Sequence, residues 1–127
     1  MNMATRRILL VDDDLSMLKI FRKHLELAGY QVDEAVDGEG AFEKIRHDPP
    51  DLIILDIMLP KLNGYEVCAK LKEDTVYQHI PIIMFTAKGM PQEHVTGLMF
   101  GAQVYLSKTC SAGELLGHVK ELLSRSA

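Results

Sequence analysis

The chain alternates between short apolar runs and longer stretches in which apolar residues recur at helical spacing. Residues 52–55 and 80–85 are continuous apolar runs, which is typical of strands buried on both faces. Residues 7–11 and 103–107 are two further strand-like runs, and residues 31–36 alternate in polarity, as in a strand near a sheet edge. The pattern therefore predicts five strands.

Helices are predicted between and after these strands. The two clearest helices are expected over residues 15–28, where Gly29 ends the helix, and over residues 115–123. Shorter helices are expected around residues 41–45, 67–71 and 90–100. Five strand–helix repeats predict an α/β fold in which a five-stranded parallel sheet carries helices on both faces. We expect one domain over residues 1–127, with its core at about 6–124, and no linker.

Polar side chains stand at the ends of four of these strands. Asp12 and Asp13 follow the first strand, Asp56 ends the third, Thr86 the fourth, and Lys108 follows the fifth. Because parallel strands all end at one edge of the sheet, we expect these groups to face one crevice. Carboxylates gathered there repel one another, and a hard cation such as Mg²⁺ relieves that repulsion. Such a set is suited to receive a phosphoryl group, with an ionised aspartate as the nucleophile.

Each of these residues also has a common structural role. One of the aspartates at 12–14 is expected to cap the following helix, Thr86 could bond its own backbone, and a single lysine such as Lys108 is usually solvated. Their joint placement at four strand ends is what favours a site. A nucleotide- or flavin-binding domain would need a glycine-rich turn after the first strand, where aspartates stand instead. A metal hydrolase is disfavoured because no histidine stands near these positions.

Charge and composition exclude other classes. The net charge is −4 and no basic run is present, so we expect no direct contact with nucleic acid. No apolar run approaches the ~20 residues of a membrane span, so we expect no membrane association. Cys68 and Cys110 fit neither a disulfide framework nor a zinc site, which suggests reduced cysteines and a cytoplasmic location.

Four motifs surround the polar positions at the strand ends: Ile8-Leu-Leu-Val-Asp-Asp-Asp14, Leu55-Asp-Ile-Met-Leu-Pro60 with Asn63-Gly64, Phe85-Thr-Ala87, and Tyr105-Leu-Ser-Lys108. Together they resemble the receiver domains of two-component response regulators. The resemblance covers about residues 7–123. It implies a flavodoxin-like, doubly wound sheet with strand order 2-1-3-4-5.

The resemblance also implies roles for the acids. Asp56 would be the phosphoacceptor. Asp12 and Asp13 would bind Mg²⁺, with Asp56 and the backbone carbonyl of Met58 completing the protein ligands. Lys108 would pair with the phosphoryl oxygens.

Three more residues would transmit the change. The Thr86 hydroxyl and the backbone N–H of Ala87 would contact the phosphoryl group, and Tyr105 would be the aromatic residue that moves inward. Together they would remodel a surface made by residues 90–100, the strand at 103–107 and the last helix. The side chains of Gln92, Glu93 and His94 are expected to meet a partner there.

The resemblance implies a signalling domain and not a conventional enzyme, although it would carry its own phosphorylation and dephosphorylation chemistry. The phosphoryl donor would be a sensor histidine kinase or a histidine phosphotransfer protein. The output would be a downstream effector protein or an output domain. An alternative from another class is an interaction module that works without phosphorylation.

The sequence departs from the family pattern in two places. Thr109 follows Lys108 where the family usually has a proline in a cis peptide bond. A cis bond before a residue other than proline costs about 3–4 kcal/mol, so either the bond is trans and the loop rearranges, or the fold carries that strain. Residues Gln103 and Val104 replace an acidic pair that is typical of one dimerising subfamily, which argues against its charged dimer interface here.

Overall fold

The computed structural model describes residues 5–86 and 101–125 of the chain. The elements of this part follow one another as β1 (Arg7–Val11), α1 (Leu15–Leu27), β2 (Gln31–Ala35), α2 (Gly38–His47), β3 (Leu52–Asp56), α3 (Gly64–Glu73), β4 (Ile82–Thr86), β5 (Val104–Ser107) and α4 (Ala112–Arg125). The helix predicted around residues 90–100 lies outside the described residues.

The five strands form one parallel sheet in the order β2-β1-β3-β4-β5. The α/β, flavodoxin-like fold predicted from the sequence is therefore confirmed. β3 lies at the centre with all five of its residues buried, and β2 lies at one edge, as its alternating pattern indicates. β5 begins at Val104, one residue later than expected. Gln103 instead bonds Ile82 twice, since its N–H donates to the Ile82 carbonyl (2.9 Å) and its Oε1 accepts from the Ile82 N–H (2.7 Å).

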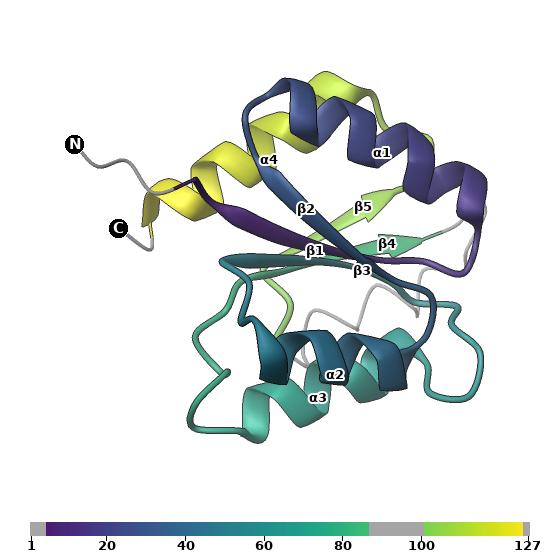
Figure 1. The fold of residues 1–127 in the computed structure, drawn as a ribbon, viewed down its shortest axis with the longest axis vertical. Helices are drawn as coiled ribbons and strands as arrows, with labels where there is room; N and C mark the ends of the chain where they lie inside the picture. Colours follow the sequence, from purple (N-terminus) through teal and green to yellow (C-terminus); the bar gives the residue numbers. More distant parts are fainter. Residues whose placement is uncertain (1–4, 87–100, 126–127) are drawn as a thin grey trace.

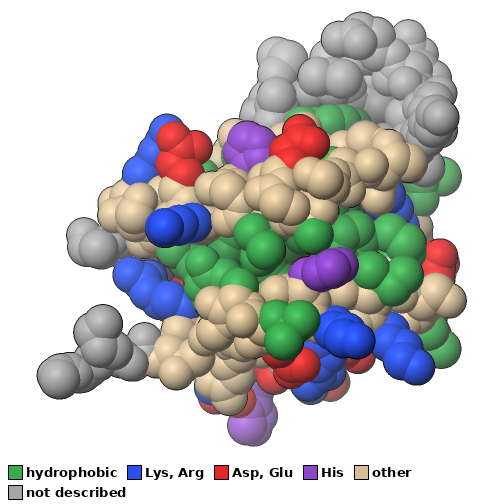
Figure 2. Space-filling view, turned by 90° about the horizontal axis from the view of Figure 1, so that it is seen from above, with side chains coloured by type: hydrophobic (Ala, Val, Ile, Leu, Met, Phe, Trp, Pro, Cys, Tyr) green, Lys and Arg blue, Asp and Glu red, His purple; other side chains and the backbone are tan. Residues whose placement is uncertain are grey.

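Helices cover both faces of the sheet (Figure 1). Alternate strand residues point to opposite faces. Ile8 and Leu10 of β1 therefore pack with α1 and α4, whereas Leu9 and Val11 pack with α2 and α3. Figure 2 looks onto α1 and α4, where hydrophobic side chains form a band between charged ones. None of the helices in residues 5–86 and 101–125 is both long and apolar enough to cross a membrane.

The helices that begin near the strand ends are capped by side chains. Asn63 and Glu66 form a reciprocal capping box at the start of α3. The next residue, Gly64, lies against the end of β3, because its N–H donates to the Ile57 carbonyl at 2.8 Å. A Cβ at Gly64 would lie 2.4 Å from the Asp56 carbonyl oxygen. Only glycine therefore lets α3 begin this close to the backbone of Asp56.

Candidate functional site

Two buried aspartates end neighbouring strands. Asp12 follows β1 and Asp56 is the last residue of β3, and each residue is only 2% exposed. Because β1 and β3 are adjacent and parallel, the two carboxylates come to the same edge of the sheet. Buried carboxylates are unfavourable unless hydrogen bonds or positive charges compensate them. The pair therefore requires cationic partners.

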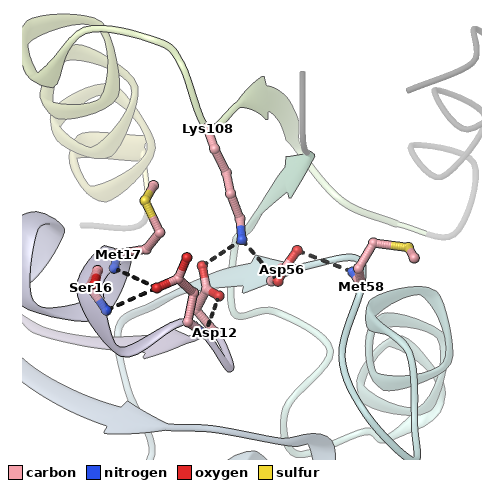
Figure 3. A network of polar contacts seen from close by, with 7 residues as sticks. Asp12, Ser16, Met17, Asp56, Met58 and Lys108 are labelled. Atoms are coloured by element: carbon pink, nitrogen blue, oxygen red, sulfur yellow. Dashed lines mark hydrogen bonds and ion pairs between the residues drawn. The ribbon is translucent and has the colours of Figure 1, made fainter. Parts of the chain in front are cut away.

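Lys108, the first residue after β5, supplies one such partner. Its Nζ lies 2.9 Å from Asp12 Oδ2 and 3.0 Å from Asp56 Oδ2, and its side chain is 18% exposed. Figure 3 shows the side chain extending from the end of β5 to a point between the two carboxylates. The structure thus brings together three of the residues that the sequence placed at strand ends. One ammonium group faces two carboxylates, so the cluster keeps a net negative charge.

The three consecutive aspartates have different positions. Asp14 is the N-cap of α1, where its Oδ1 accepts from the N–H groups of Ser16 (2.9 Å) and Met17 (3.4 Å). The Asp14 N–H in turn donates to Asp12 Oδ1 at 2.9 Å, which orients the buried carboxylate. Asp13, between them, is exposed. The prediction that one of the three caps a helix is confirmed.

The surroundings perturb both members of the ion pair. Burial raises the pKa of Asp56 to about 6, against the opposing effect of the hydrogen bond from Lys108. The value of about 6 already includes the charge of Asp12, which acts in the same direction as burial. For Lys108, burial lowers the pKa, but the bonds to Asp12 and Asp56 outweigh burial and the pKa is raised. An added cation at the carboxylates would favour the ionised form of Asp56.

The acids also fit a metal ion. Asp12, Asp13 and Asp56 each offer one carboxylate oxygen, and these atoms lie within 4.8 Å of one another. An all-oxygen set with excess negative charge suits a hard dication such as Mg²⁺. The Met58 N–H donates to Asp56 Oδ1 at 3.1 Å, so the backbone that carries the expected fourth ligand lies beside the acids.

Two of the remaining expected residues lie on β4 and β5. Thr86 ends β4 and is paired with Ser107 of β5, while Ala87 lies outside the described residues. Tyr105 is half-buried on β5, and its hydroxyl lies 3.0 Å from the hydroxyl of Tyr65 on α3. No sequence pattern indicates this partner, because a contact between residues 40 positions apart depends on the tertiary fold.

The turn after β5 contains the departure at Thr109. In the described part of the chain every peptide bond is trans, including that between Lys108 and Thr109. The carbonyl of Ser107 accepts the N–H of Cys110 at 3.0 Å, which closes a β-turn with Lys108 and Thr109 at its central positions. Of the two arrangements expected here, the structure has the trans bond, and Lys108 still contacts both carboxylates.

The family model of the response regulator receiver domain matches residues 8–120. The chain belongs to this family. The receiver is 44% identical over 121 residues to the alkaline phosphatase synthesis transcriptional regulatory protein PhoP of Bacillus subtilis (strain 168), covering 95% of the chain and 50% of that protein. It is 42% identical over 120 residues to the DNA-binding dual master transcriptional regulator RpaA of Synechocystis sp. (strain ATCC 27184 / PCC 6803 / Kazusa), covering 94% of the chain and 50% of that protein. The receiver thus spans about half the length of the curated relatives it matches.

Solved structures agree with this assignment. The receiver superposes with a TM-score of 0.90 on a putative response regulator from Chloroflexus aurantiacus J-10-fl, at 34% identity, covering 94% of this chain and 98% of that one. It also matches the signal receiver domain of a signal transduction histidine kinase from Syntrophus aciditrophicus, with a TM-score of 0.88 and 34% identity, covering 94% and 91% of the two chains. The resemblance stated from the four motifs is confirmed.

Proposed function

We propose that Asp56 accepts a phosphoryl group from a phosphohistidine of a sensor histidine kinase or a histidine phosphotransfer protein. In this step a carboxylate oxygen of Asp56 bonds to phosphorus while the bond from phosphorus to the imidazole nitrogen breaks, and the electron pair stays on the imidazole. The observation that carries the proposal is the position of Asp56, buried at the end of the central strand with Lys108 Nζ at 3.0 Å. Phosphoryl transfer needs positioning and charge neutralisation, and this site offers both.

The neighbouring groups have separate roles in this proposal. Asp12, Asp13, Asp56 and the backbone carbonyl of Met58 would hold Mg²⁺, which when bound neutralises charge on the phosphoryl oxygens. Lys108, already beside both carboxylates, exchanges its contact with Asp56 for one with a phosphoryl oxygen. The negative charge that remains around Lys108 is what supports a role for the cation.

In this proposal the change is transmitted from Asp56 to the neighbouring strands β4 and β5. The Thr86 hydroxyl and the Ala87 N–H bind the phosphoryl group, and Tyr105 moves inward. These shifts change the surface made by residues 90–100, β5 and α4 (Ala112–Arg125), which corresponds to the last helix of the chain. Residues 90–100, including Gln92, Glu93 and His94, lie outside the described residues, so this part of the proposal rests on the family relationship.

The partners follow from the same relationship. The relatives named above are transcriptional regulators about twice as long as the matched region, so we propose that residues 1–127 form one receiver domain whose output is a further domain or a separate effector protein. The receiver itself does not bind nucleic acid in this proposal, and it works in the cytoplasm. The alternative of a phosphorylation-independent interaction module has no support in a site that keeps Asp12, Asp56 and Lys108 in contact.

The test is intact-protein mass spectrometry after incubation with acetyl phosphate, with and without Mg²⁺. We expect a phosphoryl adduct that requires Mg²⁺, that is absent in Asp56→Asn and that persists in the control Asp48→Asn, whose carboxylate is largely exposed and away from the site. Because an acyl phosphate is hydrolysed readily, beryllofluoride binding is measured in parallel as a stable mimic. A wild-type protein that neither forms an adduct nor binds beryllofluoride would refute the proposal.

A further inference from the structure

The turn that carries Lys108 is held by hydroxyl groups on both sides of the lysine. Ser107 Oγ accepts the N–H of Thr109 at 3.1 Å and lies 2.7 Å from the Thr109 hydroxyl. We propose that Ser107 and Thr109 are positioning residues that set the place of Lys108 at the carboxylates. This inference rests on the proposed function, in which Lys108 neutralises charge on the phosphoryl group.

The ammonium group of a lysine can be held at one position only if the backbone that carries the side chain is itself held in place. Its four-carbon stem is flexible, so the ammonium group is placed only as well as the backbone that carries it. Lys108 is a central residue of a tight turn, and the residues before and after it are joined by the two hydroxyl contacts. The side-chain bond from Ser107 to the N–H two residues on is the kind of local bond by which serine stabilises turns.

The backbone bonds of the turn do not provide this restraint alone. The contact from the Cys110 N–H to the Ser107 carbonyl closes the turn but does not engage the Thr109 N–H. Ser107 Oγ satisfies it, and the Thr109 hydroxyl pairs with the same oxygen. A polar side-chain network therefore stands where a proline ring would otherwise restrict the backbone.

The test compares three variants of the turn. Thr109→Val keeps the shape but removes one hydroxyl, Thr109→Ser keeps the hydroxyl, and Ser107→Ala removes both contacts. Beryllofluoride binding in saturating Mg²⁺ and Mg²⁺ binding alone are measured by calorimetry. We expect beryllofluoride to bind about 3-fold more weakly to Thr109→Val and about 10-fold more weakly to Ser107→Ala, as for the loss of one or two hydrogen bonds, while Thr109→Ser stays within about 2-fold of wild type.

The Mg²⁺ measurement separates positioning from general loosening of the site. A displaced Lys108 releases carboxylate oxygens and removes positive charge from the metal site, so Mg²⁺ affinity should stay the same or rise in Thr109→Val and Ser107→Ala. Loss of Mg²⁺ and beryllofluoride affinity together would mean that the site has loosened, and would overturn the inference. So would an equal loss in Thr109→Ser and Thr109→Val.

Two control serines complete the design. Ser111→Ala removes the hydroxyl that accepts the Glu114 N–H (3.0 Å) at the start of α4, and Ser124→Ala removes a hydroxyl that donates to the Glu121 carbonyl (2.8 Å). Both are expected to bind beryllofluoride as wild type does, even if Ser111→Ala unfolds at a lower temperature. If wild type binds beryllofluoride and the turn variants match it, only the present inference fails. If wild type neither binds beryllofluoride nor forms an adduct with acetyl phosphate, the proposed function fails together with it.

Discussion

Two half-buried lysines form hydrogen bonds at opposite ends of the sheet. Lys108 follows β5 and bonds two carboxylates. Lys72, near the end of α3, bonds two backbone carbonyls in the segment that leads into β4, those of Gln78 (2.9 Å) and Ile80 (2.8 Å). Burial lowers the pKa of Lys72, whereas the bonds to Asp12 and Asp56 outweigh burial at Lys108 and raise its pKa.

The difference lies in the charge of the partners. The carbonyls accept hydrogen bonds from Lys72 without neutralising its charge, and these bonds tie α3 to the segment that leads into β4. The Lys108 ammonium is shared between two anions and can exchange one of them for another. In this protein the lysine with ionised partners is therefore the one at the candidate site, and the lysine with neutral partners holds the segment before β4.

The largest effect should come from removing the shared ammonium. Lys108→Met keeps the stem but leaves the carboxylates without their cationic partner. We expect adduct formation with acetyl phosphate and Mg²⁺ to slow about 100- to 1,000-fold, the range for losing one preorganised hydrogen-bond donor. Mass spectrometry over time checks this, with Lys72→Met as the control that should react at the wild-type rate. Similar slowing in both variants would remove the distinction between the two lysines.

A second effect is the pH dependence of stability that Asp56 imposes. Its pKa is raised to about 6 in the folded protein, so its contribution to stability is fully present below about pH 4 and is lost as pH rises through 6. Asp56→Asn should therefore be more stable than wild type at pH 7 by up to about 3 kcal/mol, and the gap should close towards pH 4. Urea unfolding between pH 4 and 8 without divalent cations checks this.

The matching control for the pH effect is Mg²⁺. Saturating Mg²⁺ compensates the negative charge of the carboxylates in the wild type. It should therefore narrow the difference in free energy of unfolding between wild type and Asp56→Asn at pH 7. A gap that is the same at every pH would show that the stabilisation of Asp56→Asn arises from packing, not from the titration of Asp56.

The smallest effect should follow from Lys72→Met. The two carbonyls lose their donor, but the cost of burying the ammonium group is also removed, so we expect the free energy of unfolding to fall by about 1–2 kcal/mol. Urea unfolding of Lys72→Met beside Lys70→Met, a variant of a neighbouring lysine on α3, measures the contribution of the contacts. A loss of the same size in both variants would assign the effect to α3 as a whole.

Periodicity was sufficient to predict most of the fold. Continuous apolar runs located the buried strands, and the alternating run located β2 at an edge. The strand order came from the resemblance to receiver domains, since short crossovers alone leave several topologies. Asp56 and Lys108 could be placed at one edge because parallel strands share a direction.

Side-chain partnerships were less predictable. Three consecutive aspartates look alike in sequence, yet Asp12 is buried, Asp13 is exposed and Asp14 caps α1. Lys72 reads as a solvated helix residue, and its carbonyl partners become visible only once the path of the following loop is known. Thr109 was recognised as a departure from the family, but the bonds that replace proline depend on the geometry of the turn.

The first turn of α3 also has a mechanical consequence. Gly64 lies against the backbone of Asp56, and the next residue, Tyr65, shares a hydroxyl contact with Tyr105. β3 and β5 are not neighbours in the sheet, since β4 runs between them. The start of α3 thus gives the tip of β3 a connection to β5 that bypasses β4, made of the backbone contact at Gly64 and the hydroxyl contact between Tyr65 and Tyr105.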